Sequence, residues 1–217
     1  MAQPDAADTP IPTHAARPWL LWALAALAVA ALAGLNRVTE ARIAQHAERA
    51  QAARIADVLI GLDYDNEPLA DALRIEPAGS ATMTAYRARV AGVVVGVALT
   101  VTAPRGYQGP IDLLVGIAAD GRVLGLRVLR QTETPGLGAE IAVADSPWSR
   151  QFAGRSRQDT PAETWSVRRD GGRFDQLTGA TVSSRAVVAA LQEALLQFEA
   201  RQAVLLETAA APEGLPQ

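Results

Sequence analysis

The chain has 217 residues and a net charge of −3, with 20 basic and 23 acidic residues. This length suits one globular domain with additional segments, and the charge gives no basic surface for nucleic acid. Cysteine is absent, and the only histidines, His14 and His46, precede the expected globular part. The composition therefore excludes disulfides, iron–sulfur clusters, thiolate or histidine catalysis and most zinc or haem ligation in that part. Redox work there would need an organic cofactor.

The N-terminal region is predicted to be a tail followed by a membrane anchor. Residues 1–17 are polar and dotted with prolines, which predicts a disordered tail. Residues 18–35 form an uncharged run rich in leucine and alanine, close to the about 20 apolar residues that a spanning helix needs. The Ala-Leu-Ala triplet at 31–33 resembles a signal-peptide cleavage site, but the run is long for a signal core. We therefore predict an uncleaved transmembrane helix at 18–36.

Arginine placement around this predicted helix bears on its orientation. Arg17 precedes the span, whereas Arg37, Arg42, Arg49 and Arg54 follow it. The positive-inside rule by itself places the following domain in the cytoplasm, although the rule has little force for long translocated domains. Orientation therefore stays open on the residues alone.

The middle of the chain changes from helical to strand patterns. Residues 37–77 are predicted to be a helical linker, with a helix at 38–62 that acts as a solvated spacer and a loop-rich stretch at 63–77. The globular domain is expected at 78–205. Its strand signals are β-branched runs separated by glycine, proline and an Asp-Gly turn at 120–121; they lie at 90–101, 111–118 and 123–129. The pattern predicts an α+β fold, with a twisted, mainly antiparallel sheet and packed helices.

Side-chain alternation and helical spacing predict the core. In the last strand, Leu124, Leu126 and Val128 are expected to face the core. Trp148 and Phe152, four residues apart in a short helix or turn, are interpreted as core aromatics. A further strand is predicted at 165–167. The final helix has an apolar stripe and a serine cap; its stripe is Val187, Val188, Leu191, Leu195 and Phe198, and its cap is Ser183 or Ser184. Residues 206–217 are predicted to be a disordered tail.

Two glycine-containing stretches are the candidate site. The first is Glu133-Thr134-Pro135-Gly136-Leu137-Gly138, a rigid loop that directly follows a strand. The second runs from Asp175 to Arg185 and presents Thr181 at the start of the last helix, after a turn that Gly179 permits. The unpaired N–H groups of a helix start favour a phosphate. Arg185 is interpreted as a solvated surface charge rather than a partner of that phosphate.

Both stretches resemble one protein family. Asp175-x-x-Thr178-Gly179-Ala180-Thr181 is similar to the signature of proteins that carry covalently bound FMN. Glu133 to Gly138 resembles a hallmark of the FMN-binding domain in the G subunit of Rnf electron-transport complexes and in the C subunit of sodium-pumping NADH:quinone reductases. The resemblance implies an FMN joined by a phosphoester to Thr181. The other positions that it implies for flavin binding are Thr178, Gly179, Ala180, Glu133, Thr134, Gly136, Leu137 and Gly138.

The resemblance also implies a setting. It predicts a single-pass protein of the bacterial inner membrane whose FMN domain is periplasmic. Its partners would be the other Rnf subunits, with a flavin transferase during maturation. The chain alone would be an electron relay with no catalytic residues and no metal site. The C subunit of the quinone reductase, a flavin-bearing regulatory domain and a scaffold domain without a cofactor are the alternatives.

Overall fold

The computed structural model describes residues 18–76, 81–144 and 146–208. The chain divides into two units, residues 1–48 and 49–217. The predicted tail at 1–17 and most of that at 206–217 lie outside the described residues.

The first unit contains most of helix α1 (Pro18–Val58). One continuous helix thus covers both the predicted span and most of the predicted spacer, because no proline or helix-ending glycine motif interrupts 19–58. Within the part of the chain that the structure describes, no helix is both sufficiently long and sufficiently apolar to cross a membrane. The span predicted at 18–36 includes positions 18, 20, 21, 35 and 36, whose side chains lie outside the description.

The second unit is built on a five-stranded sheet with strand order β1-β2-β3-β4-β5. Every neighbouring pair is antiparallel, which confirms the predicted α+β class and the sheet type. The predicted hairpin forms, and Gly121 occupies its turn with φ +84°. The strands are β1 (Ala72–Ile75), β2 (Met83–Val90), β3 (Val93–Ala103), β4 (Ile111–Ala118) and β5 (Val123–Arg130).

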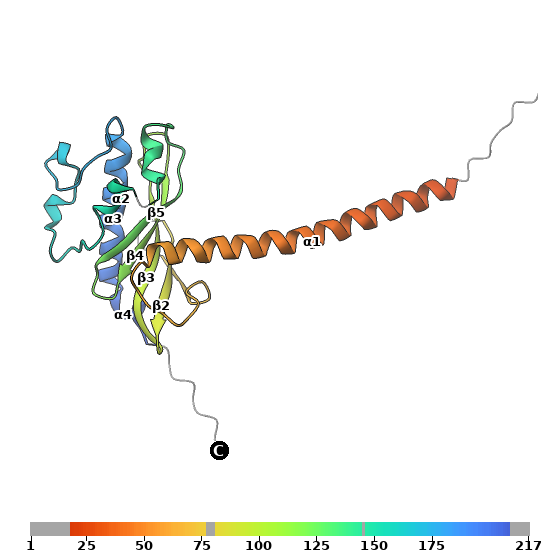
Figure 1. Ribbon diagram of the computed structural model, residues 1–217, viewed down its shortest axis with the longest axis horizontal. Helices are drawn as coiled ribbons and strands as arrows, with labels where there is room; N and C mark the ends of the chain where they lie inside the picture. The colour runs from red at the N-terminus through yellow and green to blue at the C-terminus, as the bar shows by residue number, and fades with distance from the viewer. Residues whose placement is uncertain (1–17, 77–80, 145, 209–217) are drawn as a thin grey trace, which may run out of the picture. The chain divides into compact units, whose positions relative to one another are not determined.

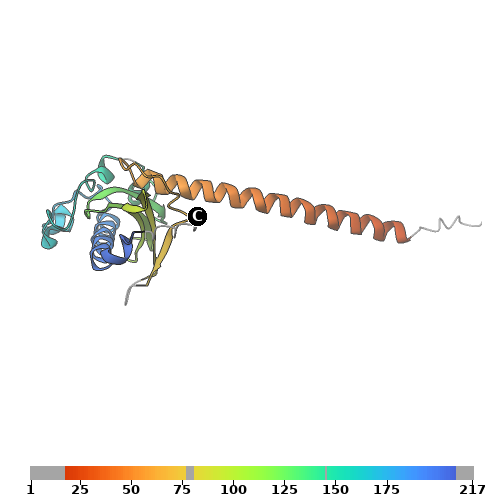
Figure 2. The ribbon, with the colours of Figure 1, turned by 90° about the horizontal axis from the view of Figure 1, so that it is seen from below.

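Helices cover both faces of this sheet (Figures 1 and 2). The long helix α3 (Thr181–Ala200) buries its apolar stripe in the larger core, and the short α4 (Gln202–Leu205) follows it. All five predicted stripe residues are buried. The last turns of α1 pack on the opposite face, where Ile55, Val58 and Leu59 are at most 2% exposed.

The end of α1 is therefore part of the globular unit. Its approach is close because Gly116 of β4 has no side chain: a Cβ there would lie 1.8 Å from the carbonyl oxygen of Val58. The β-strand β1 also precedes the domain boundary predicted at 78 and pairs with β2. The compact unit begins at Arg49, and sequence pattern alone did not indicate that the spacer would dock.

Strand β5 shows why one predicted core position was wrong. Leu126 and Val128 pack against the larger core, as predicted, but Leu124 packs on the opposite face with the end of α1. The register shifts beside Gly116, so that Leu124 is an extra residue between two paired positions. Such a bulge breaks the strict alternation of faces.

The segment between β5 and α3 contains little regular structure. It holds the 3₁₀ helices η1 (Gly138–Ala142), η2 (Ala162–Thr164) and η3 (Arg168–Asp170), and the helix α2 (Pro147–Arg150). Trp148 and Phe152 are core aromatics, as predicted, in a T-shaped contact with ring centroids 5.3 Å apart. The strand predicted at 165–167 does not form; only an isolated bridge joins Val167 to Phe174.

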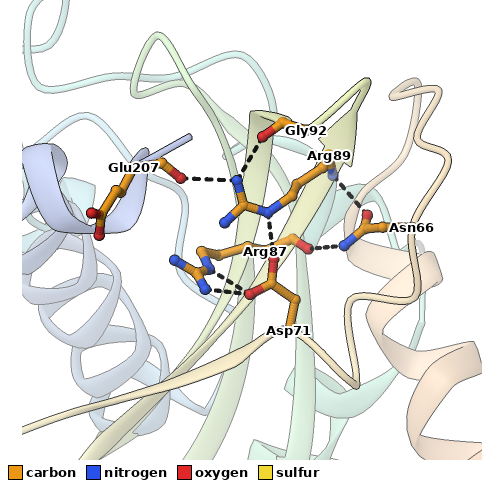
Figure 3. Close-up of polar contacts among 6 residues, drawn as sticks. All are labelled: Asn66, Asp71, Arg87, Arg89, Gly92 and Glu207. Atoms are coloured by element: carbon orange, nitrogen blue, oxygen red, sulfur yellow. Dashed lines mark hydrogen bonds and ion pairs between the residues drawn. The ribbon is translucent and has the colours of Figure 1, made fainter. Parts of the chain in front are cut away.

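A charged cluster closes the β1–β2 edge of the sheet (Figure 3). Asp71 accepts hydrogen bonds from the Nε atoms of Arg87, at 2.8 Å, and Arg89, at 2.5 Å. Nη1 of Arg89 also donates to the carbonyl oxygens of Gly92 and Glu207, both at 2.8 Å. The cluster thus joins the sheet edge to the segment that follows α4.

Candidate functional site

A cavity of about 410 Å³ lies where the two candidate stretches meet. The stretches are about 45 residues apart in the sequence, and the antiparallel sheet and α3 bring them together. The described residues that line the cavity are Tyr107, Glu133, Thr134, Leu137, Gly138, Arg169, Gly179, Ala180, Thr181, Val182 and Ser183.

The first wall is a tight turn that follows β5. The N–H of Leu137 donates to the carbonyl oxygen of Thr134 at 3.2 Å, and Gly136 has φ +74°. Proline is common at the second position of a type II turn, and glycine supplies the positive φ that the third position requires. The turn leaves Leu137 46% exposed, at the cavity. It is therefore a rigid element that offers an apolar surface.

The second wall is the start of α3. The N–H of Ala180 donates to the carbonyl oxygen of Leu177 at 3.0 Å across a turn in which Gly179 has φ +78°. Thr181 is the first helical residue, and no side chain caps the N–H groups of the first turn. These groups and the helix dipole give the cavity a partial positive charge beside the Thr181 hydroxyl.

The serine cap predicted from the sequence is wrong. Ser184 accepts a hydrogen bond from the N–H of Leu177 at 3.0 Å, and Ser183 donates to Glu133, so neither serine caps the helix. The helix begins at Thr181, before both serines, and they lie inside its first turn.

Glu133 lines the cavity and joins three segments there. It is 5% exposed, accepts a hydrogen bond from the Ser183 hydroxyl at 2.6 Å, and accepts one from the N–H of Gln108 at 3.2 Å. Two glycines make room for its carboxylate: a Cβ on Gly106 or on Gly138 would lie 2.7 Å from a Glu133 oxygen. A buried carboxylate needs such partners, and here they fix one wall of the cavity to the other.

Seven of the nine predicted site residues line the cavity, and two do not. Glu133, Thr134, Leu137 and Gly138 line the cavity from the first wall, and Gly179, Ala180 and Thr181 line it from the second. Two predicted residues do not line it: Gly136, which forms the turn, and Thr178, which is exposed.

Sequence reasoning missed four cavity residues, Tyr107, Arg169, Val182 and Ser183, and had interpreted Ser183 only as a possible helix cap. Arg169 belongs to η3, which packs near the helix start although it precedes Thr181 by 12 residues.

Arg185 is exposed, as predicted, and does not line the cavity, but it also has a carboxylate partner. Its Nε and Nη2 atoms donate to the two carboxylate oxygens of Asp170, at 2.6 and 2.8 Å. This pairing, foremost its side-chain hydrogen bond, lowers the pKa of Asp170. Arg185 therefore holds η3 against α3.

The arrangement suits a ligand that combines an anionic group with a flat apolar part. The uncapped N–H groups, the Thr181 hydroxyl and the basic residue Arg169 are suited to an anionic group. Leu137 and Tyr107, which is 68% exposed, supply apolar surface. A phosphate-bearing flavin fits this set of groups.

Comparison with known proteins assigns the same ligand class. Residues 106–196 match the family described as FMN-binding domain. The matched range contains both walls of the cavity, so the fold and the site define an FMN-binding-domain protein. In fold, the chain resembles the C subunit of a Na⁺-translocating NADH-quinone reductase from Parabacteroides distasonis; the TM-score is 0.51 at 17% identity, covering 75% of this chain and 96% of that one.

The sequence relatives are more specific. The G subunit of the ion-translocating oxidoreductase complex from Pseudomonas aeruginosa is 46% identical over 147 residues, which cover 66% of this chain and 69% of the relative. The protein with the same description from Stutzerimonas stutzeri is 45% identical over 139 residues, covering 64% of this chain and 60% of the relative. The chain therefore belongs to the family of G subunits of ion-translocating oxidoreductase complexes.

Proposed function

We propose that this chain is the electron-relay subunit of an Rnf-type ion-translocating oxidoreductase complex and carries one FMN on Thr181. The observation that carries the proposal is the cavity between the 133–138 turn and the Thr181 helix start. Both of its walls lie within the residues that match the FMN-binding domain. When bound, the flavin supplies the capacity to accept and release electrons. The protein's part is to hold it and to set its surroundings.

The described residues have distinct parts in this proposal. The uncapped start of α3 binds the phosphate, because its N–H groups have no side-chain partner. Leu137 provides an apolar wall for the flavin ring, and the Glu133–Ser183 hydrogen bond keeps that wall at a fixed distance from Thr181.

Attachment requires a bond between Oγ of Thr181 and the phosphorus of FMN. The hydroxyl loses its proton, and an activated flavin nucleotide loses its leaving group. The described residues that line the cavity include no cysteine or histidine that would catalyse this step, and a flavin transferase is proposed to perform it. Its product is a phosphoprotein whose flavin does not dissociate.

The proposed setting is the bacterial inner membrane. The uncharged run at 18–35 supports a single spanning helix, and its described leucines, Leu24, Leu27 and Leu32, are at least 65% exposed. A periplasmic FMN domain and contacts with the other Rnf subunits complete the proposal. The assignment to the G subunits is favoured over the quinone-reductase alternative because the G subunits compared are 40–46% identical, whereas the likeness to the quinone reductase is one of fold.

The test compares two threonines in the same motif. Thr181→Val is expected to abolish the covalent flavin while the domain stays folded, because valine is nearly isosteric with threonine. Thr178→Val is the matched control, since Thr178 is exposed and outside the cavity. Both are expressed as the full chain with a flavin transferase, and intact mass and in-gel flavin fluorescence are measured. Flavin retained by Thr181→Val, or lost from Thr178→Val alone, would contradict the assignment.

A further inference from the structure

Arg169 is the only basic residue among the described residues that line the cavity. The one acidic residue there, Glu133, is buried and held by the Ser183 hydroxyl and the N–H of Gln108. An anionic ligand that entered the cavity would therefore meet a fixed carboxylate on one side. Arg169 is the available opposing charge.

The arginine nearest to the motif, Arg185, does not line the cavity. Arg185 lies in the first turns of α3, but two of its nitrogens are occupied by the carboxylate of Asp170. Among residues 18–76, 81–144 and 146–208, Arg169 forms no ion pair, although its charge is one of the smaller effects that lower the pKa of neighbouring Asp170. Arg185 therefore pairs with the turn that contains Asp170, whereas Arg169 lines the cavity.

The turn that carries Arg169 is held at both ends. The N–H of Arg168 donates to the carbonyl oxygen of Phe174 at 2.7 Å, and the N–H of Gly172 donates to that of Val167 at 3.1 Å. Asp170 is tied to α3 by Arg185. The backbone of Arg169 is therefore placed before any ligand arrives, which lowers the entropic cost of a contact.

We propose that Arg169 binds the phosphate of the flavin, together with the uncapped start of α3. This inference rests on the proposed function and adds a residue that the sequence motifs do not contain. Guanidinium groups bind phosphate with paired, charge-assisted hydrogen bonds. Arg169 therefore distinguishes phosphorylated flavin from the same ring without phosphate.

The test uses the full chain, purified in detergent from cells that lack the flavin transferase, so that Thr181 is unmodified. FMN and riboflavin are titrated separately, and dissociation constants are measured from flavin fluorescence. Arg169→Gln is expected to weaken FMN binding about tenfold, as the loss of one charge-assisted contact implies, and to leave riboflavin binding unchanged. Arg173→Gln is the matched control, because this exposed arginine lies on the same turn but does not line the cavity.

Three outcomes would overturn the inference: equal FMN affinity in Arg169→Gln and the unaltered protein, an equal loss in Arg173→Gln, or an equal loss of riboflavin binding. If the unmodified chain binds neither compound, initial rates of covalent flavin transfer at limiting flavin donor replace the titration. In that transfer experiment, Arg169→Gln must be about tenfold slower than Arg173→Gln. Equal rates would overturn the role of Arg169 but not the proposed function. Absence of flavin on the unaltered protein after co-expression with the transferase would instead overturn the proposed function.

Discussion

Gly179 and Gly136 have nearly the same backbone conformation but different surroundings. Their φ angles are +78° and +74°, in the left-handed region that disfavours side chains. A Cβ on Gly136 would meet nothing within 4 Å, whereas one on Gly179 would lie 2.8 Å from Cδ2 of Leu137. A side chain would therefore cause similar backbone strain at the two glycines. Only at Gly179 would it also meet Leu137, on the opposite wall of the cavity.

Substituting Gly136 and Gly179 separately distinguishes backbone strain from a change in the shape of the cavity. Gly136→Ala and Gly179→Ala are each expected to lower the free energy of unfolding by about 1 kcal/mol. Only Gly179→Ala should also displace Leu137 and change the flavin's visible circular dichroism. Denaturant unfolding and the flavin spectrum are measured for both variants. Equal spectra in the two variants would mean that Leu137 does not contact the flavin.

At the scale of elements, the close packing of α1 on the sheet depends on glycines. Gly116 and Gly125 are paired neighbours on β4 and β5, and both face Val58. A Cβ on Gly116 would lie 1.8 Å from the Val58 carbonyl oxygen, whereas one on Gly125 would lie 3.1 Å from it. Because the obstructing atom belongs to the backbone, a side chain at Gly116 can be accepted only if the end of the helix moves.

We therefore expect Gly116→Ala to lower the free energy of unfolding by about 3 kcal/mol, at the upper end of what overpacking costs. Gly125→Ala should cost about 1 kcal/mol, since its neighbour needs to move by only a few tenths of an ångström. Proteolysis near residue 58 should also become faster in Gly116→Ala alone. Similar stability losses in the two variants would show that α1 is not held by this contact.

The sequence predicted the elements that have strong local signals. The hairpin at β4 and β5, the stripe of α3 and the Trp148–Phe152 pair were predicted because alternation, turn residues and helical spacing are local properties. The failures have non-local causes. Leu124 was assigned to the wrong face because a bulge adds a residue without a sequence mark.

In the candidate site, too, features with local sequence signals were predicted correctly and tertiary contacts were not. The 133–138 turn and the Thr181 helix start were recognised from their residues, and the fold places both at one cavity. The serine cap was wrong because Ser183 and Ser184 have tertiary partners, Glu133 and the N–H of Leu177. Arg169 reaches the cavity through the fold of an irregular segment, which no periodicity predicts.

At the scale of the whole molecule, only two charged side chains are buried among the described residues, Glu133 and Arg89, and Arg89 lies in a charged cluster at the β1 edge. Arg89 is 7% exposed and shares the carboxylate of Asp71 with Arg87. Asn66 reinforces the cluster by donating to the carbonyl oxygen of Arg87 at 2.9 Å and accepting from the N–H of Arg89 at 2.7 Å (Figure 3). Asp71 is thus the single carboxylate that balances two guanidinium groups within this cluster.

Burial by itself would raise the pKa of Asp71, but hydrogen bonds from Arg89 and Arg87, and the charges of both, outweigh burial and lower the pKa below its ordinary value. A carboxyl group with a lowered folded-state pKa stabilises the fold above its unfolded-state pKa, which is about 3.9 for aspartate. The contribution is lost as the pH falls below that value and through the folded-state pKa. The linked stability is therefore complete at neutral pH and declines only in acid.

Asp71→Asn should lower the free energy of unfolding by about 3 kcal/mol at pH 7, because it leaves the buried Arg89 without a carboxylate. The gap between the unaltered protein and the variant should shrink as the pH falls below about 4. Asp159→Asn, which removes one of the two carboxylate partners of the exposed Arg122, is the control and should cost much less, since exposed ion pairs contribute little. Denaturant unfolding across pH 2.5–8 measures all three proteins. An Asp71→Asn gap that is independent of pH, or equal to that of Asp159→Asn, would show that the cluster does not stabilise the fold through the charge of Asp71.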